Sequence, residues 1–494
     1  MLITFVILYL MLSVGIGLFA ATRVHNAKDF AVAGRSLPLP VVTATVFATW
    51  FGAEAVFGIS ATFVKDGLTG VVADPFGSSL CLVFAGVLFS RYLYKLNILT
   101  LGDFYRMRYS RPVEVITTLC IVASYLGWVA AQIKALGLIF YVVTDGVVSQ
   151  EAGMILGTAI VLAYTTFGGM FSVAILDFVQ MAVSMGGLLF IAFVVSGKVD
   201  GGASHVIAHA RDAGKLEFFP PADPMLWLTF LGAWVTMMLG SIPQQDVFQR
   251  ITSASSQKIA LWGSVLGASI YFCFTFVPMF IAYSATLIDP KLFADLLEKD
   301  TQLLLPTLVL QHTPLVAQVL FFGAVLSAIM SCSSATLLAP SVTFAENVLK
   351  GFYPGMRDHQ FLWAMRGSLV GFAVIVLSFA LHSESSIFKM VENAYKVTLA
   401  GAFVPLLAGI LWRRATSQGA LAAIVGGLGS WILIEVMEGE ASPVPPQLIG
   451  LGVSLLGMWA GSLLPQWIAH PQSAHDLHAT MHRKTAAHTG HVAH

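Results

Sequence analysis

The sequence predicts an all-α integral membrane protein, and two observations lead to that fold class. Hydrophobic residues make up 57% of the 494 residues, charged residues only 11%, and the mean hydropathy is +0.81. This composition is far more apolar than that of a water-soluble globular chain. Apolar runs of about 20 residues recur along the chain, each long enough to cross a hydrocarbon core of about 30 Å as a helix. No large soluble domain fits between them, so membrane lipid surrounds the chain.

The apolar runs can be placed in order. Residues 2 to about 20 lack a basic leading segment and a small-x-small cleavage site, so we interpret them as a retained first helix and not as a signal peptide. The later runs are centred near residues 50, 80, 128, 158, 184, 236, 270, 332, 371, 399, 425 and 455. We therefore predict about thirteen transmembrane helices.

Basic residues are distributed unevenly between alternate connections. One set of connections carries 17 Lys and Arg residues, whereas the other carries only Lys198, Arg211, Lys215, Lys291 and Lys299. Positively charged loops stay in the cytoplasm. The bias predicts a multi-pass protein of the plasma membrane with its N-terminus outside and its C-terminus in the cytoplasm, as an odd number of spans requires.

Charge and cysteine content indicate no further class of partner. The net charge is zero, which gives no reason to expect nucleic acid. The four cysteines lie inside apolar runs without paired spacing or neighbouring histidines, so neither a disulfide framework nor a zinc site is expected. Residues 467–494 form a histidine-rich tail, for which we favour a solvated end over a metal-binding one. No feature indicates an oligomeric state.

Ionisable side chains inside apolar runs need an explanation, because each costs at least about 2.5 kcal/mol at a helix centre. Such positions are candidates for a cavity, a pathway or an ion site, and they are Glu54, Asp74, Asp177, Asp246, Glu392 and Lys396. Glu392 and Lys396 are four residues apart, so we favour a simple ion pair on one helical face for these two. Asp177 has no basic residue within a helical turn, and Lys134 could snorkel or pair across helices.

Two runs have a composition suited to binding a small cation. The second run combines Gly52, Gly58 and the buried Glu54, which favours a broken helix, although small residues also serve plain helix packing. The ninth run is dense in hydroxyls, including Ser331 and Ser334 on one helical face. Such hydroxyls either bond to their own backbone or offer neutral oxygen ligands to a hard cation. Together the two runs favour an ion site.

Five stretches, taken in order and spacing, resemble the sodium:solute symporter family over nearly the whole chain. They are residues 29–35, 100–109, 167–180, 243–250 and 328–334. The stretch 167–180 resembles the family's Gly-Gly, Ala-Val, Thr-Asp, Gln motif, with Leu176 where threonine is usual. The resemblance implies sodium as the coupling ion and a small molecule as the substrate.

The resemblance also implies a domain organisation that agrees with the number of runs. A core of five helices would be followed by five more in inverted topology, with one helix before and two after. The implied segments are 1–22 for the preceding helix, 38–198 and 222–414 for the two repeats, 415–466 for the last two helices, and 467–494 for the His-rich cytoplasmic tail.

By position, the resemblance implies two ion sites. The main sodium site would use the backbone carbonyls of Ala48, Phe51 and Ala328 and the side chains of Ser331 and Cys332. The family usually has serine or threonine at Cys332, and a soft thiol is a poor ligand for a hard cation. A second ion position, known in some members, would use Asp177 with Ser331 and Ser334.

Substrate contacts implied by the family are Trp50, Glu54, Asp74, Trp128 and Gln244. Parts of the chain look closest to the high-affinity choline transporter branch, in which aromatic rings hold a quaternary ammonium by cation–π attraction. Gln244 stands where that branch has tryptophan, so a hydrogen-bonding solute is expected to suit this position better. Choline is therefore a candidate and not a firm expectation.

The expected function is sodium-coupled symport of a small polar, zwitterionic or cationic solute into the cell by alternating access. Alternatives are a membrane sensor that binds ligand without flux, and a proton-coupled or facilitative carrier. We do not expect an enzyme, because the spans hold no metal-ligand cluster and no nucleophile–base pair.

Overall fold

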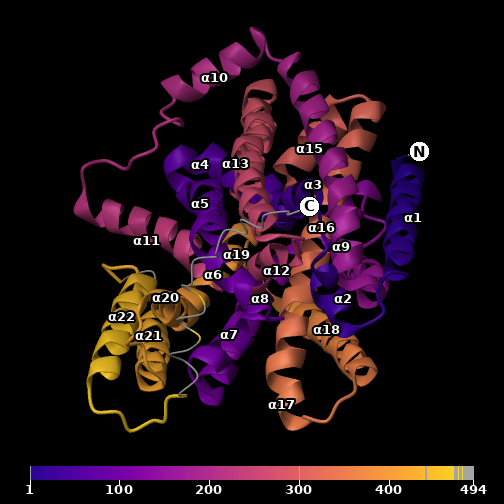
Figure 1. Cartoon of the computed structure of the whole chain (residues 1–494). Helices are drawn as coiled ribbons and strands as arrows, with labels where there is room; N and C mark the ends of the chain where they lie inside the picture. The colour runs from indigo at the N-terminus through magenta and orange to yellow at the C-terminus, as the bar shows by residue number, and fades with distance from the viewer. Residues whose placement is uncertain (1, 300, 440–441, 472–476, 478–480, 482–494) are drawn as a thin grey trace, which may run out of the picture.

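The computed structural model describes the chain except residues 1, 300, 440–441, 472–476, 478–480 and 482–494. Its described part consists of helices joined by short connections and contains no β-strand, only one isolated β-bridge (Figure 1). The predicted all-α fold class is confirmed. Most of the predicted histidine-rich tail lies outside the described residues. Of its histidines the structure places His470, 3.2 Å from Nη1 of Arg108 and 3.2 Å from Oγ of Ser417.

The described residues up to Ser196 form nine α-helices. Side-chain caps begin several of them; Thr100, for example, accepts a hydrogen bond from the amide of Asp103 in a reciprocal capping box. The helices are α1 (Leu2–Ala21), α2 (Ala27–Val32), α3 (Leu39–Trp50), α4 (Ile59–Gly70), α5 (Ser78–Phe84), α6 (Ser90–Leu93), α7 (Leu101–Arg108), α8 (Arg111–Val143) and α9 (Gln150–Ser196).

The second half continues in the same way, with Ser256, Ser386 and Thr416 as N-caps that accept from backbone amides. Its helices are α10 (Gly202–Asp212), α11 (Pro224–Gly240), α12 (Gln245–Ser253), α13 (Gln257–Ile288), α14 (Pro290–Lys299), α15 (Leu304–His312), α16 (Leu315–Phe344), α17 (Lys350–Phe352), α18 (Asp358–His382), α19 (Ile387–Thr398), α20 (Val404–Leu411), α21 (Ser417–Met437) and α22 (Pro446–Leu463).

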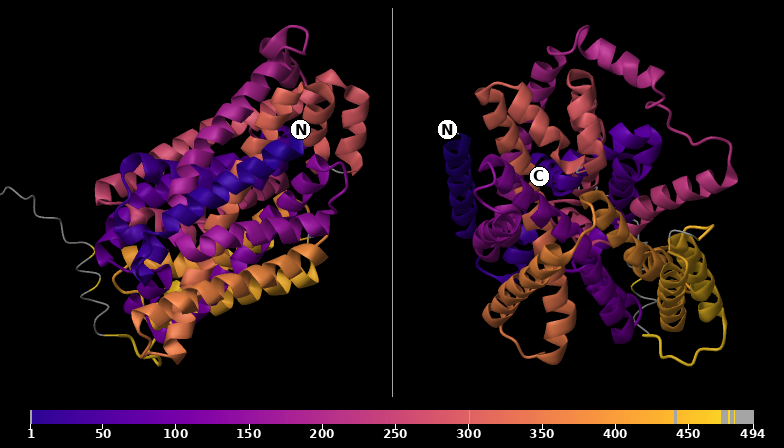
Figure 2. Two further views of the ribbon diagram at one scale, coloured as in Figure 1. Left: turned by 90° about the vertical axis from the view of Figure 1, so that its right-hand side faces the viewer. Right: turned by 180° about the vertical axis from the view of Figure 1, so that it is seen from behind.

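Among the described residues, 10 helical segments are long and apolar enough to cross a membrane, or up to 12 if two bent pairs each count as one span. The bent pairs are α3 with Glu54–Gly70, at 57°, and α11 with α12, at 44°. The long helices run side by side along a common direction (Figure 2). Length and composition therefore give slightly fewer spans than the predicted thirteen.

Helix α9 accounts for the difference, because its 47 residues turn back on themselves at Gly169. A Cβ placed on Gly17 would lie 2.6 Å from Tyr164 Cβ and 3.1 Å from Leu176 Cδ1, although a straight helix would separate those two residues by about 18 Å. Gly169 has φ +48°, and a Cβ there would lie 2.4 Å from the carbonyl oxygen of Phe30. Only glycine fits this turn, and its two arms would count as two spans.

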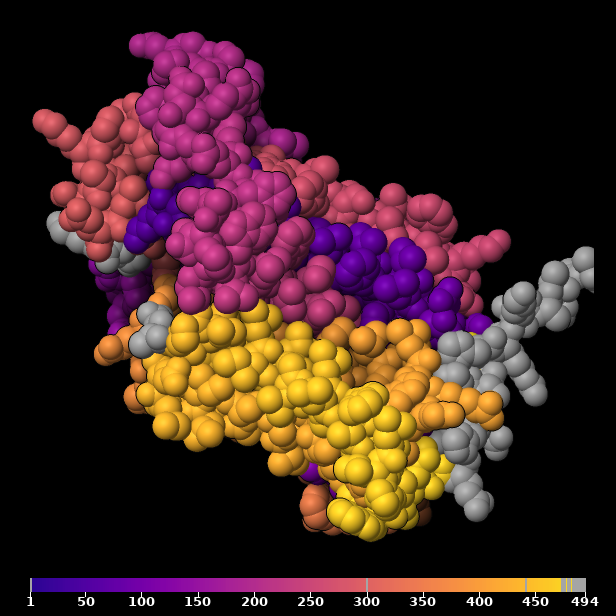
Figure 3. All heavy atoms as spheres, turned by 90° about the vertical axis from the view of Figure 1, so that its left-hand side faces the viewer, coloured from indigo at the N-terminus to yellow at the C-terminus, as the bar shows by residue number. Residues whose placement is uncertain are grey.

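The bundle has an apolar outer surface and a polar centre. On α1 the large exposed side chains are apolar, with Met11 67% and Phe19 69% exposed, as expected of a helix that faces lipid. Helices α21 and α22 form a hairpin that packs beside α11 at the edge of the molecule (Figure 3). Helices α3, α8, α16 and α19 pack around the break in the second span, which places the candidate site at the core.

Candidate functional site

The second span is broken at Phe51–Ala53, as predicted. Phe51 leaves the helical conformation at φ −82° and ψ 81°, and a π-helical turn resumes at Glu54. The amide of Gly52 donates to the carbonyl of Trp50 at 3.0 Å, and that of Ala53 donates to Oε1 of Gln132 on α8 at 2.8 Å. The carbonyls of Ala48 and Thr49 thereby lose the donors that a continuous helix would supply.

Of the two freed carbonyls, that of Ala48 lies next to α16. Oγ of Ser331 lies 3.4 Å from the carbonyl oxygen of Ala48. A Cβ on Gly52 would lie 2.7 Å from Cys332 Cβ, so Cys332 packs directly against the residue that follows Phe51. Ala328 lies one helical turn before Ser331 on the same helix. The structure thus gathers the residues of the predicted main sodium site at the contact between α3 and α16.

Asp177 lies beside this contact on the second arm of α9. Its carboxylate accepts hydrogen bonds from Oγ of Ser331 and from Oγ1 of Thr45 on α3. Oγ of Ser334 donates to the carbonyl of Ser331 at 2.9 Å, so it bonds to backbone in this conformation. Sequence reasoning missed Thr45; its signal was a hydroxyl three residues before Ala48, in the α3 turn that precedes the break.

Aromatic rings pack together next to the break. The ring of Trp50 lies 5.4 Å from that of Trp128 on α8, and it stacks on Tyr395 of α19 at 6.0 Å with an interplanar angle of 6°. Trp128 and Tyr395 are 5.7 Å apart, and Tyr125 stacks on Trp128 at 5.9 Å. Tyr395 was not predicted, since a lone tyrosine in an apolar run carries no signal of its own.

The two predicted carboxyl groups differ in their surroundings. Asp74 accepts hydrogen bonds from Ser78 and, at 2.7 Å, from the hydroxyl of Tyr271 on α13. Oε1 of Glu54 is buried with no hydrogen-bond partner. Glu54 and Asp74 lie close enough to interact electrostatically.

Gln244, at the bend between α11 and α12, is held by internal hydrogen bonds. Its Nε2 donates to Oγ of Ser124 at 2.9 Å and lies 3.4 Å from Oγ1 of Thr398. The expectation that this amide is available to a solute is not met in this conformation. Asp246, two residues later, accepts a hydrogen bond from the hydroxyl of Tyr125, whose ring stacks on Trp128, so Asp246 supports the aromatic cluster.

A model of the sodium:solute symporter family matches residues 30–427, which is most of the chain. The chain belongs to the sodium:solute symporter family. It is therefore a sodium-coupled solute symporter and a multi-pass membrane protein, with sodium as its coupling ion, and not an enzyme. The predicted family and function class are confirmed.

Relatives of this symporter include high-affinity choline transporters. The human protein is 26% identical over 449 residues, which cover 86% of this chain and 75% of that protein. The high-affinity proline transporter PutP of Bacillus subtilis is 24% identical over 91% of this chain and 95% of that protein. The predicted likeness to the choline transporter branch is confirmed.

Solved structures share the fold. A Na+-coupled sialic acid symporter in a substrate-bound outward-open state superposes with a TM-score of 0.79 at 20% identity, over 95% of this chain and 99% of that chain. The nucleobase-cation symporter Mhp1 superposes with a TM-score of 0.58 at 14% identity, over 91% and 98%.

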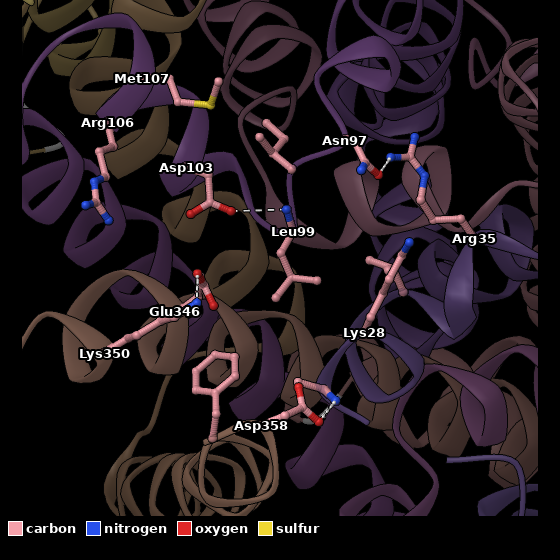
Figure 4. A pocket seen from close by; sticks show the side chains of 14 residues that line it. Lys28, Arg35, Asn97, Leu99, Asp103, Arg106, Met107, Glu346, Lys350 and Asp358 are labelled. Carbon is pink, nitrogen blue, oxygen red and sulfur yellow. Dashed lines mark hydrogen bonds and ion pairs between the residues drawn. The ribbon is translucent and has the colours of Figure 1, made fainter. Parts of the chain in front are cut away.

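The symporter's site is closed in this conformation. None of the twelve predicted site residues exposes more than 4% of its surface. A polar cavity of 520 Å³ lies at the end of the bundle where α2, α7 and the end of α16 meet, lined among others by Lys28, Arg35, Asp103 and Glu346 (Figure 4). Beside it, Asn347 donates to Glu114 at 2.9 Å, so α8 is joined there to the π-helical turn that follows α16.

A second cavity, of 330 Å³, lies at the opposite end, between α11, α19 and the α21–α22 hairpin. Glu392, Lys396 and Glu435 line it, and Nζ of Lys396 is 3.7 Å from Oε1 of Glu435 on α21. We expected Lys396 to pair along its own helix with Glu392; its ion pair instead crosses to Glu435 on another helix. Nζ of Lys134 donates to the carbonyls of Ser383 and Ser385 just before α19, which answers the question left open by sequence.

Proposed function

We propose that the symporter imports a small organic solute by alternating access, with sodium bound between α3 and α16 at Ala48, Phe51, Ala328, Ser331 and Cys332. The observation that carries this proposal is the position of Ser331, whose hydroxyl lies beside both the freed carbonyl of Ala48 and the carboxylate of Asp177. Backbone carbonyls and hydroxyls are the neutral oxygens that a hard monovalent cation prefers.

A second cation site is proposed at Asp177, with Ser331, Ser334 and Thr45 as its hydroxyl ligands. Asp177 is fully buried, and the groups that donate hydrogen bonds to it, Thr45 and Ser331, are hydroxyls. A cation at this place would balance its charge inside the protein. Because Ser331 borders both sites, occupancy of one site would change the other.

The substrate site is proposed at the aromatic rings on the other side of the break, with Trp50, Trp128, Glu54 and Asp74 as its lining. Gln244 would join it only after its bonds to Ser124 open. Tyr395 on α19 covers Trp50, so movement of α19 would open this site toward the cavity that borders Lys396. Sodium would stabilise the break in the second span and, through it, the lining of the substrate site.

The two-repeat organisation is also proposed. Segments 38–198 and 222–414 would be the inverted repeats, with 1–22 before them and 415–466 after them. In support, the two bent spans, Leu39–Gly70 and Pro224–Ser253, stand first in the two segments. Corresponding interrupted helices in the two halves are typical of transporters whose binding site lies between repeats.

We propose a plasma-membrane location, with lipid contacting the apolar outer faces of helices such as α1, the N-terminus outside and the C-terminus in the cytoplasm. The bias of 17 basic residues against five supports this orientation. Single reporter cysteines in the connections 144–149 and 413–416 test it. Only the first should react with an impermeant reagent in intact cells, and the reverse labelling would contradict the orientation.

Uptake of radiolabelled solutes into proteoliposomes tests the function. Uptake should rise with an inward sodium gradient, and Cys332→Ser should lower the sodium concentration for half-maximal uptake, because a hydroxyl replaces the soft thiol. Uptake that follows a proton gradient or no gradient would contradict sodium coupling. Ligand binding without flux would favour a sensor.

A further inference from the structure

The centre of the symporter holds two buried carboxyl groups without a basic partner. Glu54 exposes 4% of its surface and Asp74 exposes 1%. In the described part of the chain, neither forms an ion pair with lysine, arginine or histidine. An ionised carboxylate buried without a counter-charge is costly. The pair is therefore neutralised by protonation or by positive charge supplied from outside the chain.

The hydrogen bonds show what kind of cation fits. Asp74 already accepts from Ser78 and Tyr271. Oε1 of Glu54 and the hydroxyl of Tyr395 are both buried and have no hydrogen-bond partner. Buried polar atoms nearly always have one. The site therefore holds two polar atoms that lack a hydrogen-bond partner. Because an ionised carboxylate can only accept hydrogen bonds, a ligand that satisfies Glu54 must bring N–H or O–H donors.

The surroundings favour an organic cation over a bare ion. Helix α19, which carries Tyr395, packs against the π-helical turn that begins at Glu54, and the ring of Tyr395 stacks on Trp50 and packs against Trp128. Aromatic faces attract organic ammonium groups.

We propose that the central site takes a small protonated primary or secondary amine, with Glu54 as its hydrogen-bonding counter-ion and Tyr395 as a second partner. This inference rests on the proposed substrate site and names the class of its solute. A quaternary ammonium would supply the charge but no donor for Glu54. A neutral alcohol would supply a donor but no charge.

Matched ligand series test the inference on the purified full-length symporter by thermal shift. Each series holds an amine, its N-trimethyl derivative and its alcohol: ethanolamine, choline and ethylene glycol; benzylamine, benzyltrimethylammonium and benzyl alcohol; butylamine, butyltrimethylammonium and butanol. A ligand that binds the folded state raises its unfolding midpoint. In at least one series the amine should raise the midpoint more than both partners. Trimethylated or neutral members that stabilise equally or better, or no stabilisation by any amine, would overturn the proposal.

Glu54→Gln assigns the effect to the residue, since it keeps the size of the side chain and removes its charge. The affinity for the amine should fall by roughly ten- to a hundredfold, as expected when a hydrogen bond to a charged group is lost. Glu151→Gln, at an exposed acidic residue in the first turn of α9, is the matched control and should change little. Unchanged amine affinity in a folded Glu54→Gln variant would contradict the role of Glu54. If that variant does not fold, the native protein still tests the solute class, through the larger rise of its unfolding midpoint with the amine than with the trimethyl derivative.

Repeating each titration with and without sodium separates this inference from sodium coupling. Amine binding that ignores sodium would contradict the coupling and leave the solute class standing. Sodium-dependent binding of a neutral or anionic solute would contradict the solute class and leave the coupling standing.

Discussion

Asp177→Asn should raise the sodium concentration for half-maximal uptake by roughly ten- to a hundredfold, because the substitution removes the carboxylate that accepts hydrogen bonds from both Thr45 and Ser331. Hydrogen bonds to a charged acceptor contribute about 1.5–3 kcal/mol, more than neutral ones. An asparagine amide would also turn a donor toward one of the two hydroxyls. Sodium titrations of uptake and of the unfolding midpoint measure the effect.

Ser184→Ala is the control for Asp177→Asn. Ser184 lies on the same arm of α9 and donates at 3.0 Å to the carbonyl of Ala324 on α16, so its loss also removes one α9–α16 hydrogen bond. The control should keep the sodium dependence of the native protein. Equal shifts in both variants would show that Asp177 acts through helix packing and not through an ion.

Gly52→Ala should abolish sodium-dependent uptake and destabilise the fold by about 1–3 kcal/mol, the usual cost of overpacking. The added methyl would lie 2.7 Å from Cys332 Cβ and 2.7 Å from Oε1 of Gln132. Either α3 moves away from α16, or Gln132 releases the amide of Ala53. Both changes displace the carbonyls proposed to bind sodium.

Gly58→Ala is the matched control on the same broken span. The nearest atom to its new methyl outside its own helix is Phe388 Cβ at 3.4 Å, which is ordinary contact. This variant should keep its unfolding midpoint and its sodium dependence. Sodium-dependent uptake at the native level in Gly52→Ala would contradict the placement of the ion at the α3–α16 contact.

The sequence predicts the spans well because each span is a local property. An apolar run is visible in the sequence without knowledge of the rest of the fold. The two arms of α9, on either side of Gly169, accordingly form two separate runs in the sequence. The break in the second span could be predicted for the same reason, since Gly52 and Glu54 are neighbours in the sequence.

Contacts between distant residues could not be predicted in this way. Thr45 and Asp177 are 132 residues apart, and nothing in either run indicates the other. Lys396 has an acidic residue four positions earlier, yet its ion pair reaches Glu435 on another helix, because the hairpin packs against α19. Gln244 has a suitable side chain for a solute, but Ser124 already occupies it.

The closed conformation has a consequence for how tightly this symporter holds its solute. With every proposed contact residue at most 4% exposed, a solute binds the fraction of molecules in which the site has opened, which in our proposal requires α19 to move away from Trp50. The apparent dissociation constant is then the intrinsic constant divided by that fraction. Sodium would strengthen solute binding by enlarging this fraction, without making a single contact with the solute, and arrival of the solute would be limited by the opening rate instead of diffusion.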